Sequence, residues 1–206
     1  MKKIPTLFKK VYNPDGRYML SEEVTPGMES IEAGYGLATV KWDGTPVYYG
    51  GVGQWFKRYD NKKRKQVPEG SIPCITAPDP ITGHWPFWVP IDWSDPANDY
   101  ICKAITNYIH YGSAQLVEGT TFEAIGPGIN GNPHDLSQGT LKVHGAMIVS
   151  DFPRDFQRAG AWLRDHMVEG VVFWLNGEPV CKLRRVDYGY TWPLHRISKV
   201  GGVDRD

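Results

Sequence analysis

The sequence is poor in cysteine, and it carries no excess of charge of either sign. Its three cysteines, Cys74, Cys102 and Cys181, are far apart in a chain of 206 residues and show no C-x-x-C spacing. That excludes a disulfide framework and a zinc knuckle, and it predicts reduced, mostly buried thiols. The 23 lysines and arginines equal the 23 aspartates and glutamates, so the formal net charge is zero. A uniformly basic protein that coats nucleic acid is therefore excluded, whereas a local basic surface is not.

Long apolar segments, internal repeats and low-complexity tracts are also missing. No apolar run approaches the roughly 20 residues of a membrane-spanning helix. The N-terminal stretch MKKIPTLFKKVYNPDG begins like a signal peptide, but it lacks the apolar centre of about seven or more residues that such a peptide needs. These absences predict a cytoplasmic protein, and 206 residues suit one ordinary domain.

Aromatic and turn-forming residues, by contrast, are plentiful. Aromatics make up 13% of the chain, and 23 Gly and 16 Pro accompany them, which favours strands and loops over a helical bundle. Runs of β-branched and aromatic residues predict strands at 37–41, 45–50, 116–125, 141–149, 168–175 and 179–184. The 3.6-residue period predicts helices over 97–110 and 154–166. Residues 66–96 are Pro-rich and predict a long irregular loop. Asn176-Gly177 indicates a hairpin whose connection is slightly longer than two residues. We therefore expect a single α+β domain built on antiparallel sheets.

Lys41 begins the motif with the most chemical content, Lys41-Trp42-Asp43-Gly44. A lysine at the end of a strand, followed by an aspartate and a glycine turn, places an amine beside a carboxylate at a sheet edge. Taken alone, such a string indicates only a junction between a strand and a turn.

Other predicted strands add the remaining parts of a nucleotidyl-transfer site. Glu123 and Glu169 supply carboxylates, and Lys182 and Arg184 share one face of their strand because side chains alternate with period two. Cations neutralise phosphates, a carboxylate holds a divalent metal, and a lysine amine can attack the α-phosphorus of a nucleotide.

The order of these strings resembles the covalent nucleotidyltransferase superfamily of ATP-dependent ligases and capping enzymes. KWDG, KRYD, FEAIG, EGVVF and KLRR match its five motifs in sequence. The longer strings PDPITGHWPFWVP, GPGINGNPHDL, HGAMIV and KLRRVDYGYTWP are similar to a family of small stand-alone ATP-dependent 5′-to-3′ RNA ligases, over roughly residues 35–195. The resemblance implies a single ATP-grasp-like nucleotidyltransferase domain of antiparallel sheets with flanking helices. An N-terminal extension would cover about 1–34, and a short tail would follow the core.

The resemblance also assigns transfer chemistry to four positions. Lys41 would form the lysyl-AMP bond, and Asp43 would orient it or reach the metal indirectly. Lys182 would contact the α-phosphate, and Glu169 would bind Mg²⁺, with Mn²⁺ as a possible substitute.

Nucleotide recognition is assigned to further positions in the same way. Arg58 would contact the ribose or an incoming 5′-phosphate, Glu123 would bind the ribose hydroxyls, and Arg184 stands where a second cation is expected. Val40 departs from the family pattern, because many RNA ligases carry Glu there. Adenine recognition would then fall to the backbone at Val40. His144 has two interpretations: it stacks on adenine, or it is a structural, hydrogen-bonded histidine.

Three other features allow two interpretations each. The basic run at 57–65 is either a solvated face or a flexible segment that holds RNA phosphates. Trp85, Phe87 and Trp88 either stack on unpaired bases or form a small core under the loop, and we favour the core. The glycines of GPGING form either a phosphate cradle or a tight turn. Their spacing fits no P-loop, so we favour the turn.

The function implied is an ATP- and Mg²⁺-dependent RNA ligase, expected to be a monomer, that joins 5′-phosphate and 3′-hydroxyl RNA ends. The alternatives are a DNA nick ligase, a capping guanylyltransferase and an inactive nucleic-acid-binding module. The two enzymes usually carry an oligonucleotide-binding barrel after the final lysine motif, and the residues that follow Arg184 are too few for one. The inactive module would not need Lys41, Glu123, Glu169 and Lys182 together.

Overall fold

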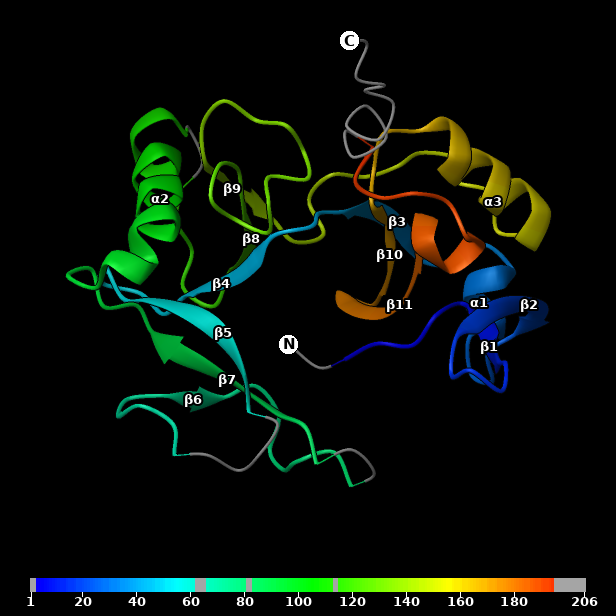
Figure 1. Ribbon diagram of the computed structural model, residues 1–206, viewed down its shortest axis with the longest axis horizontal. Helices are drawn as coiled ribbons and strands as arrows, with labels where there is room; N and C mark the ends of the chain where they lie inside the picture. The colour runs from blue at the N-terminus through cyan, green and yellow to red at the C-terminus, as the bar shows by residue number, and fades with distance from the viewer. Residues whose placement is uncertain (1–2, 62–65, 81–82, 113–114, 195–206) are drawn as a thin grey trace, which may run out of the picture. The chain divides into compact units, whose positions relative to one another are not determined.

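The computed structural model describes residues 3–61, 66–80, 83–112 and 115–194 (Figure 1). The chain divides into two compact units. Unit 1 contains residues 43–144 together with the first three, and unit 2 contains residues 4–42 and 145–206. Each unit is described by itself. Antiparallel strand pairing dominates both, and helices are few, which confirms the α+β class.

Unit 2 is built on a three-stranded sheet in the order β11-β10-β3. Its strands are β3 (Leu37–Lys41), β10 (Gly170–Leu175) and β11 (Glu178–Arg184). The other elements are the hairpin β1 (Phe8–Tyr12) and β2 (Tyr18–Val24), the helices α1 (Glu29–Glu32) and α3 (Phe156–Asp165), and the 3-10 helix η2 (Arg185–Tyr188). Ala159 and Leu163 of α3 share a buried core with Val171 and Leu183 of the sheet, so one face of the sheet is covered.

The β10–β11 hairpin turns within two residues. Leu175 pairs with Glu178, and the intervening Asn176 and Gly177 have φ angles of 53° and 81°. Two consecutive positive φ angles define the turn that best matches the twist of a hairpin. The expected hairpin is confirmed, but its connection is shorter than predicted because β11 begins at Glu178.

Gly170 of the central strand lies between Lys41 and Arg184, the cations on the two outer strands. The register pairs Gly170 with Lys41 on one neighbour and with Arg184 on the other. A Cβ on Gly170 would lie 2.1 Å from the carbonyl oxygen of Leu183 and 2.8 Å from the Cα of Arg184. Both of these are backbone atoms, so any side chain here would push β10 and β11 apart.

We therefore expect Gly170→Ala to lower the free energy of unfolding by roughly 2–3 kcal/mol, through forced displacement of the backbone. Urea unfolding followed by circular dichroism would measure this change. Gly139→Ala is the comparison, because a Cβ there meets no atom nearer than 3.3 Å, and it should destabilise less. Equal midpoints for Gly170→Ala and the unchanged chain would contradict the argument.

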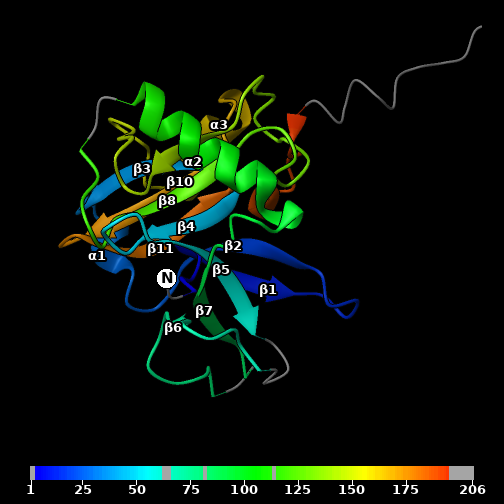
Figure 2. The same cartoon turned by 90° about the vertical axis from the view of Figure 1, so that its left-hand side faces the viewer.

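Unit 1 contains a six-stranded antiparallel sheet in the order β6-β7-β5-β4-β8-β9. The strands are β4 (Thr45–Tyr49), β5 (Trp55–Asn61), β6 (Ile72–Pro73), β7 (Trp85–Pro90), β8 (Thr121–Ile125) and β9 (Thr140–Val143). A 3-10 helix, η1 (Pro96–Asn98), leads into α2 (Asp99–Tyr111). Figures 1 and 2 show α2 lying against β8 and β9. Its Ile101, Ala104 and Ile105 share a core with Val47 and Phe122.

The prediction of an irregular loop over 66–96 is wrong for β6 and β7. Proline normally argues against a paired strand because it lacks an N–H. In β7 the prolines are compatible with pairing because their nitrogens face away from β5. Ile91 N donates to Trp55 O on the β5 side, whereas Pro86 O accepts from Cys74 N on the other side, and β6 there is only two residues long.

The cysteines are free thiols, as the sequence predicted. Cys74 and Cys102 are partly buried and Cys181 is buried, all three as free thiols. Burial raises the pKa of the Cys181 thiol to about 12. Among the described residues, no helix has the length and apolarity needed to cross a membrane.

Candidate active site

Lys41 and Glu169 form an ion pair at the end of the sheet of unit 2. Lys41 is the last residue of β3, and Glu169 directly precedes β10. The Lys41 Nζ lies 2.5 Å from the Glu169 Oε2 and 3.3 Å from the Trp42 carbonyl oxygen. The Glu169 side chain is 9% exposed and that of Lys41 is 23% exposed. The structure thus joins the predicted nucleophile, whose side chain is partly exposed, to the predicted metal ligand.

Lys182 lies on the same face of the sheet as Lys41. Val172 pairs with Thr39 on β3 and with Lys182 on β11, and residues two apart along a strand share a face. Lys41, Lys182 and Arg184 therefore project from one face, which we call the basic face. Burial, followed by the positive charges of Arg184 and Lys41, lowers the pKa of Lys182 to about 8. The positive charge of Lys182 is therefore destabilised by its surroundings, and a bound anion would stabilise it.

Arg184 is fixed by two residues that the sequence argument did not identify. Its guanidinium donates to Asp187 Oδ1 at 2.8 Å and to the Tyr18 hydroxyl at 2.7 Å. The Tyr18 hydroxyl in turn donates to Asp187 Oδ1 at 2.6 Å. Burial disfavours a charged guanidinium, but the hydrogen bonds to Asp187 outweigh this effect and raise the pKa of Arg184. The Arg-x-x-Asp spacing at 184–187 was visible in the sequence, whereas Tyr18 is too distant in the chain to be paired with it.

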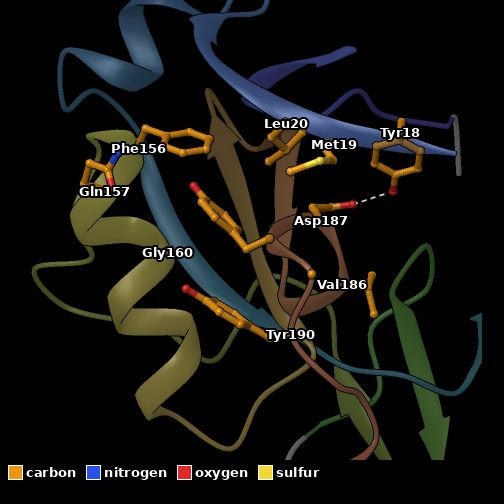
Figure 3. Close-up of a pocket in the computed structure, with 11 residues that line it drawn as sticks. Tyr18, Met19, Leu20, Phe156, Gln157, Gly160, Val186, Asp187 and Tyr190 are labelled. Atoms are coloured by element: carbon orange, nitrogen blue, oxygen red, sulfur yellow. Dashed lines mark hydrogen bonds between the residues drawn. The ribbon is translucent and has the colours of Figure 1, made fainter. Parts of the chain in front are cut away.

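A cavity of about 410 Å³ adjoins this network in unit 2, and Tyr18 and Asp187 line it. Figure 3 shows Tyr18 and Asp187 joined by a hydrogen bond among its lining residues. The lining is largely apolar and aromatic: Tyr18, Met19, Leu20, Phe156, Gly160, Val186, Tyr188 and Tyr190 contribute to it. The Tyr188 hydroxyl is buried and meets no hydrogen-bond partner among the residues that the structure describes. Asp187 therefore links this cavity to the cation at Arg184.

Arg185, the last residue of the KLRR string, is buried and does not belong to the basic face. It is 5% exposed. Its guanidinium donates to the carbonyl oxygens of Leu163, Arg164 and His166 at the end of α3. Helix C-termini present such unpaired carbonyls, and an arginine satisfies them well. Only Lys182 and Arg184 of this string reach the basic face.

Glu123 lies in unit 1, where both of its carboxylate oxygens are engaged. Oε1 accepts the Gly44 N–H at 3.0 Å, and Oε2 lies 2.8 Å from His144 Nε2. The other ring nitrogen of His144 is 3.0 Å from the Thr121 hydroxyl oxygen. These contacts support the interpretation of His144 as a structural, hydrogen-bonded histidine. Glu123 is 8% exposed, so the predicted ribose contact stays a prediction.

Arg58 and its neighbours in the basic run do not form the flexible segment that was one of the two interpretations of this run. Residues 57–61 belong to β5, which pairs with β4 on one side and β7 on the other. Arg58 Nε donates to Asp60 Oδ1 at 2.9 Å, and Lys57 Nζ donates to Asn98 Oδ1 at 2.5 Å. Residues 57–61 all pair with β7, so this part of the run is not a free segment. Residues 62–65 of the run lie outside the described residues.

The aromatic residues of β7 are largely buried, as the favoured interpretation predicted. Phe87 and Trp88 are 7% and 6% exposed, and Trp88 stacks on Tyr48 with ring centroids 5.5 Å apart. Trp85 is partly exposed and donates from its indole N–H to Ile75 O at 3.0 Å. These contacts support the small core rather than a stacking platform.

Val40, the predicted backbone contact for adenine, has its N–H already engaged. This N–H donates to Met147 O at 2.8 Å. Recognition of a base through Val40 would therefore use its carbonyl.

Glu169 is the carboxylate that a divalent metal could use beside Lys41. Among the described residues, no group of three or more His, Cys, Asp or Glu stands together as a ready-made metal cage. Mg²⁺ is commonly bound by one or two carboxylates and completed by substrate phosphates and water. Glu169 beside Lys41 and Lys182 fits that pattern.

Comparisons with known proteins give a likeness to RNA ligases. A family model for RNA ligase 1 matches residues 107–200, a range that includes Glu123, Glu169, Lys182 and Arg184. The chain therefore resembles the RNA ligases, which confirms the predicted resemblance to RNA ligases in general. In particular, RNA ligase 1 of Danio rerio is 27% identical over 143 residues. That match covers 54% of this chain and 43% of the relative, so the chain matches less than half of the relative's length.

Proposed function

We propose that this chain is an ATP-dependent RNA ligase that joins a 5′-phosphate and a 3′-hydroxyl through a lysyl-AMP intermediate. The observation that carries the proposal is the basic face, where the Lys41 amine meets Glu169 and shares its side of the sheet with Lys182 and Arg184. The proposal includes a nucleotidyltransferase fold, action in the cytoplasm, and ATP and a divalent metal as the required small molecules.

In the first step the Lys41 Nζ attacks the α-phosphorus of ATP. Glu169 Oε2, 2.5 Å from Nζ, stands where it can first take a proton from the Lys41 ammonium, which frees the lone pair of the amine for attack. An N–P bond then forms, the P–O bond to pyrophosphate breaks, and the second proton lost by the amine passes to pyrophosphate or water. Lys182 and Arg184 stabilise the negative charge of the phosphates, which is the main requirement of phosphoryl transfer. Mg²⁺ held by Glu169 would supply further charge neutralisation.

The next two steps pass AMP to RNA and then release it. An oxygen of the RNA 5′-phosphate attacks the phosphorus of lysyl-AMP, so the N–P bond breaks and a pyrophosphate bridge forms between AMP and RNA. The 3′-hydroxyl of the other end then attacks the RNA 5′-phosphorus. AMP leaves, and a phosphodiester joins the ends. Both steps develop charge on phosphate oxygens, so Lys182 and Arg184 serve them too.

The lowered pKa of Lys182 predicts a pH dependence of nucleotide binding. Below about pH 8 this lysine is charged and ready for a phosphate, whereas above pH 8 it must take up a proton when the phosphate binds. Affinity should therefore be flat below pH 8 and weaken above it, by up to about tenfold per pH unit. Calorimetry with α,β-methylene-ATP, which cannot release pyrophosphate, would measure this. Lys182→Met should bind weakly at every pH, and an unchanged pH profile in that variant would contradict the assignment.

A ligation assay with matched ends tests the proposed function. The purified chain receives ATP, Mg²⁺ and nicked, splinted or single-stranded RNA that carries a 5′-phosphate. We expect joined RNA product that needs the 5′-phosphate. Faster sealing of DNA would favour a nick ligase, and an adduct formed with GTP but not ATP would favour a capping enzyme. RNA binding without joining, insensitive to Lys41→Ala, would favour an inactive binding module.

A further inference from the structure

The turn that follows the proposed nucleophile is held from one side by a single loop of unit 1. Residues 43 and 44 form this turn, and residues 126–135, GPGINGNPHD, form the loop. Asn130 Nδ2 donates to Gly44 O at 2.6 Å and to Asp43 Oδ1 at 3.2 Å. His134 Nε2 accepts the Asp43 N–H at 3.0 Å. Two side chains of the loop therefore engage the backbone of both turn residues and the carboxylate of one.

The loop is built to hold these two side chains in place. Ile129 is 3% exposed and belongs to the core of the unit, which anchors the middle of the loop. Asn132 ties the loop to the residue that follows it, donating from Nδ2 to Leu136 O and accepting the Leu136 N–H. Gly128 has a φ of 80°, and a Cβ there would lie 2.2 Å from the ring of Tyr100. The interpretation of GPGING as a tight turn is thus confirmed, and this turn helps to hold the Asn130 side chain in place.

Glu123 completes the grip on the same turn from a strand. Its Oε1 accepts the Gly44 N–H at 3.0 Å. Asp43 and Gly44 thereby have both backbone N–H groups and the Gly44 carbonyl tied to side chains. A free strand-to-turn junction would leave these groups to water.

We propose that Asn130 and His134 are positioning residues, which fix the Asp43-Gly44 turn and the Asp43 carboxylate just after the nucleophilic Lys41. This inference rests on the proposed function. Neither residue touches the reacting atoms. The clamp reduces the conformations open to the chain two residues after Lys41, and a reacting group placed an ångström off course can lose about a hundredfold in rate. Their loss should therefore slow adenylylation while leaving the binding of ATP nearly unchanged.

Asn130→Gly is the sharpest variant, because Asn130 has a φ of 47° and glycine accepts that backbone without strain. The matched control is Asn176→Gly, the same change at a φ of 53° in the β10–β11 turn. His134→Ala removes the second contact, and His134→Gln restores an acceptor for the Asp43 N–H. We expect about a tenfold or greater drop in the lysyl-AMP rate for Asn130→Gly and His134→Ala. The half-saturating ATP concentration should change little, the rate should be largely rescued in His134→Gln, and it should not change in Asn176→Gly.

Amide hydrogen exchange supplies a readout that does not depend on catalysis. The amide of Asp43 should exchange about tenfold faster in His134→Ala, the effect of one lost hydrogen bond, and that of Gly44 should accelerate in Asn130→Gly as the turn loosens. If the unchanged chain forms no adduct, the proposed function fails while the exchange experiment still judges the clamp. Unchanged exchange at Asp43 and Gly44 would overturn the inference. So would wild-type adenylylation rates in both variants of a chain that does form the adduct.

Discussion

Lys41→Arg should leave a folded chain that no longer joins RNA ends with ATP. Arginine keeps the positive charge that pairs with Glu169, but its guanidinium stays protonated and cannot attack phosphorus. We expect joining to fall by roughly a thousandfold or more, as when other enzymes lose a covalent nucleophile. The assay is the appearance of joined, end-labelled RNA under single-turnover conditions.

The same variant should still seal RNA that already carries AMP on its 5′-phosphate. That final step does not use the Lys41 amine as a nucleophile, whereas Lys182, Arg184 and Glu169 are all still in place. Lys103→Arg, on the exposed surface of α2, is the control for a lysine-to-arginine change and should behave like the unchanged chain. If Lys41→Arg joined unactivated RNA at the normal rate, the covalent route would be wrong.

Glu169→Gln should have the second-largest effect. Glutamine preserves the size of the side chain but removes the charge that accepts a proton from Lys41 and would hold Mg²⁺. We expect adenylylation to slow by roughly a hundredfold to a thousandfold, the range seen when a group that stabilises transition-state charge is removed. The Mg²⁺ concentration for half-maximal rate should rise as well. Stopped reactions with labelled ATP at a series of Mg²⁺ concentrations would give both values.

Glu178→Gln is the matched control for that experiment. Glu178 is exposed at the start of β11, in the same sheet but at the other end of the hairpin. It should show normal rates and a normal Mg²⁺ requirement. If Glu169→Gln had the same adenylylation rate and Mg²⁺ requirement as this control, the roles proposed for Glu169 would be wrong.

Local periodicity was enough to predict the basic face. Lys182 and Arg184 alternate along one strand, so the sequence alone placed them on one side, and the register with β10 then set Lys41 beside them. Alternation does not predict the partners of Arg185, the next residue along, which donates to the carbonyl oxygens at the end of α3. No property of neighbouring residues signals that contact.

The contacts that were missed join segments far apart in the chain. Tyr18 meets Arg184 and Asp187 across more than 160 residues, and Asn130 and His134 meet the Asp43-Gly44 turn across about 90. Such pairs depend on the tertiary fold. β7 was missed for a different reason, because proline was taken as a sign of irregular structure while its missing N–H lies on the side away from β5. The predicted division into an N-terminal extension, a core and a tail stays a prediction.

Intact-mass spectrometry of the purified chain tests the central claim most directly. The chain is first treated with pyrophosphate and Mg²⁺ to remove any AMP acquired in the producing cell, and is then incubated with ATP and Mg²⁺. The account predicts one AMP per chain, mapped by peptide fragmentation to Lys41 and absent from Lys41→Arg. An unmodified chain, or AMP on a residue other than Lys41, would contradict it.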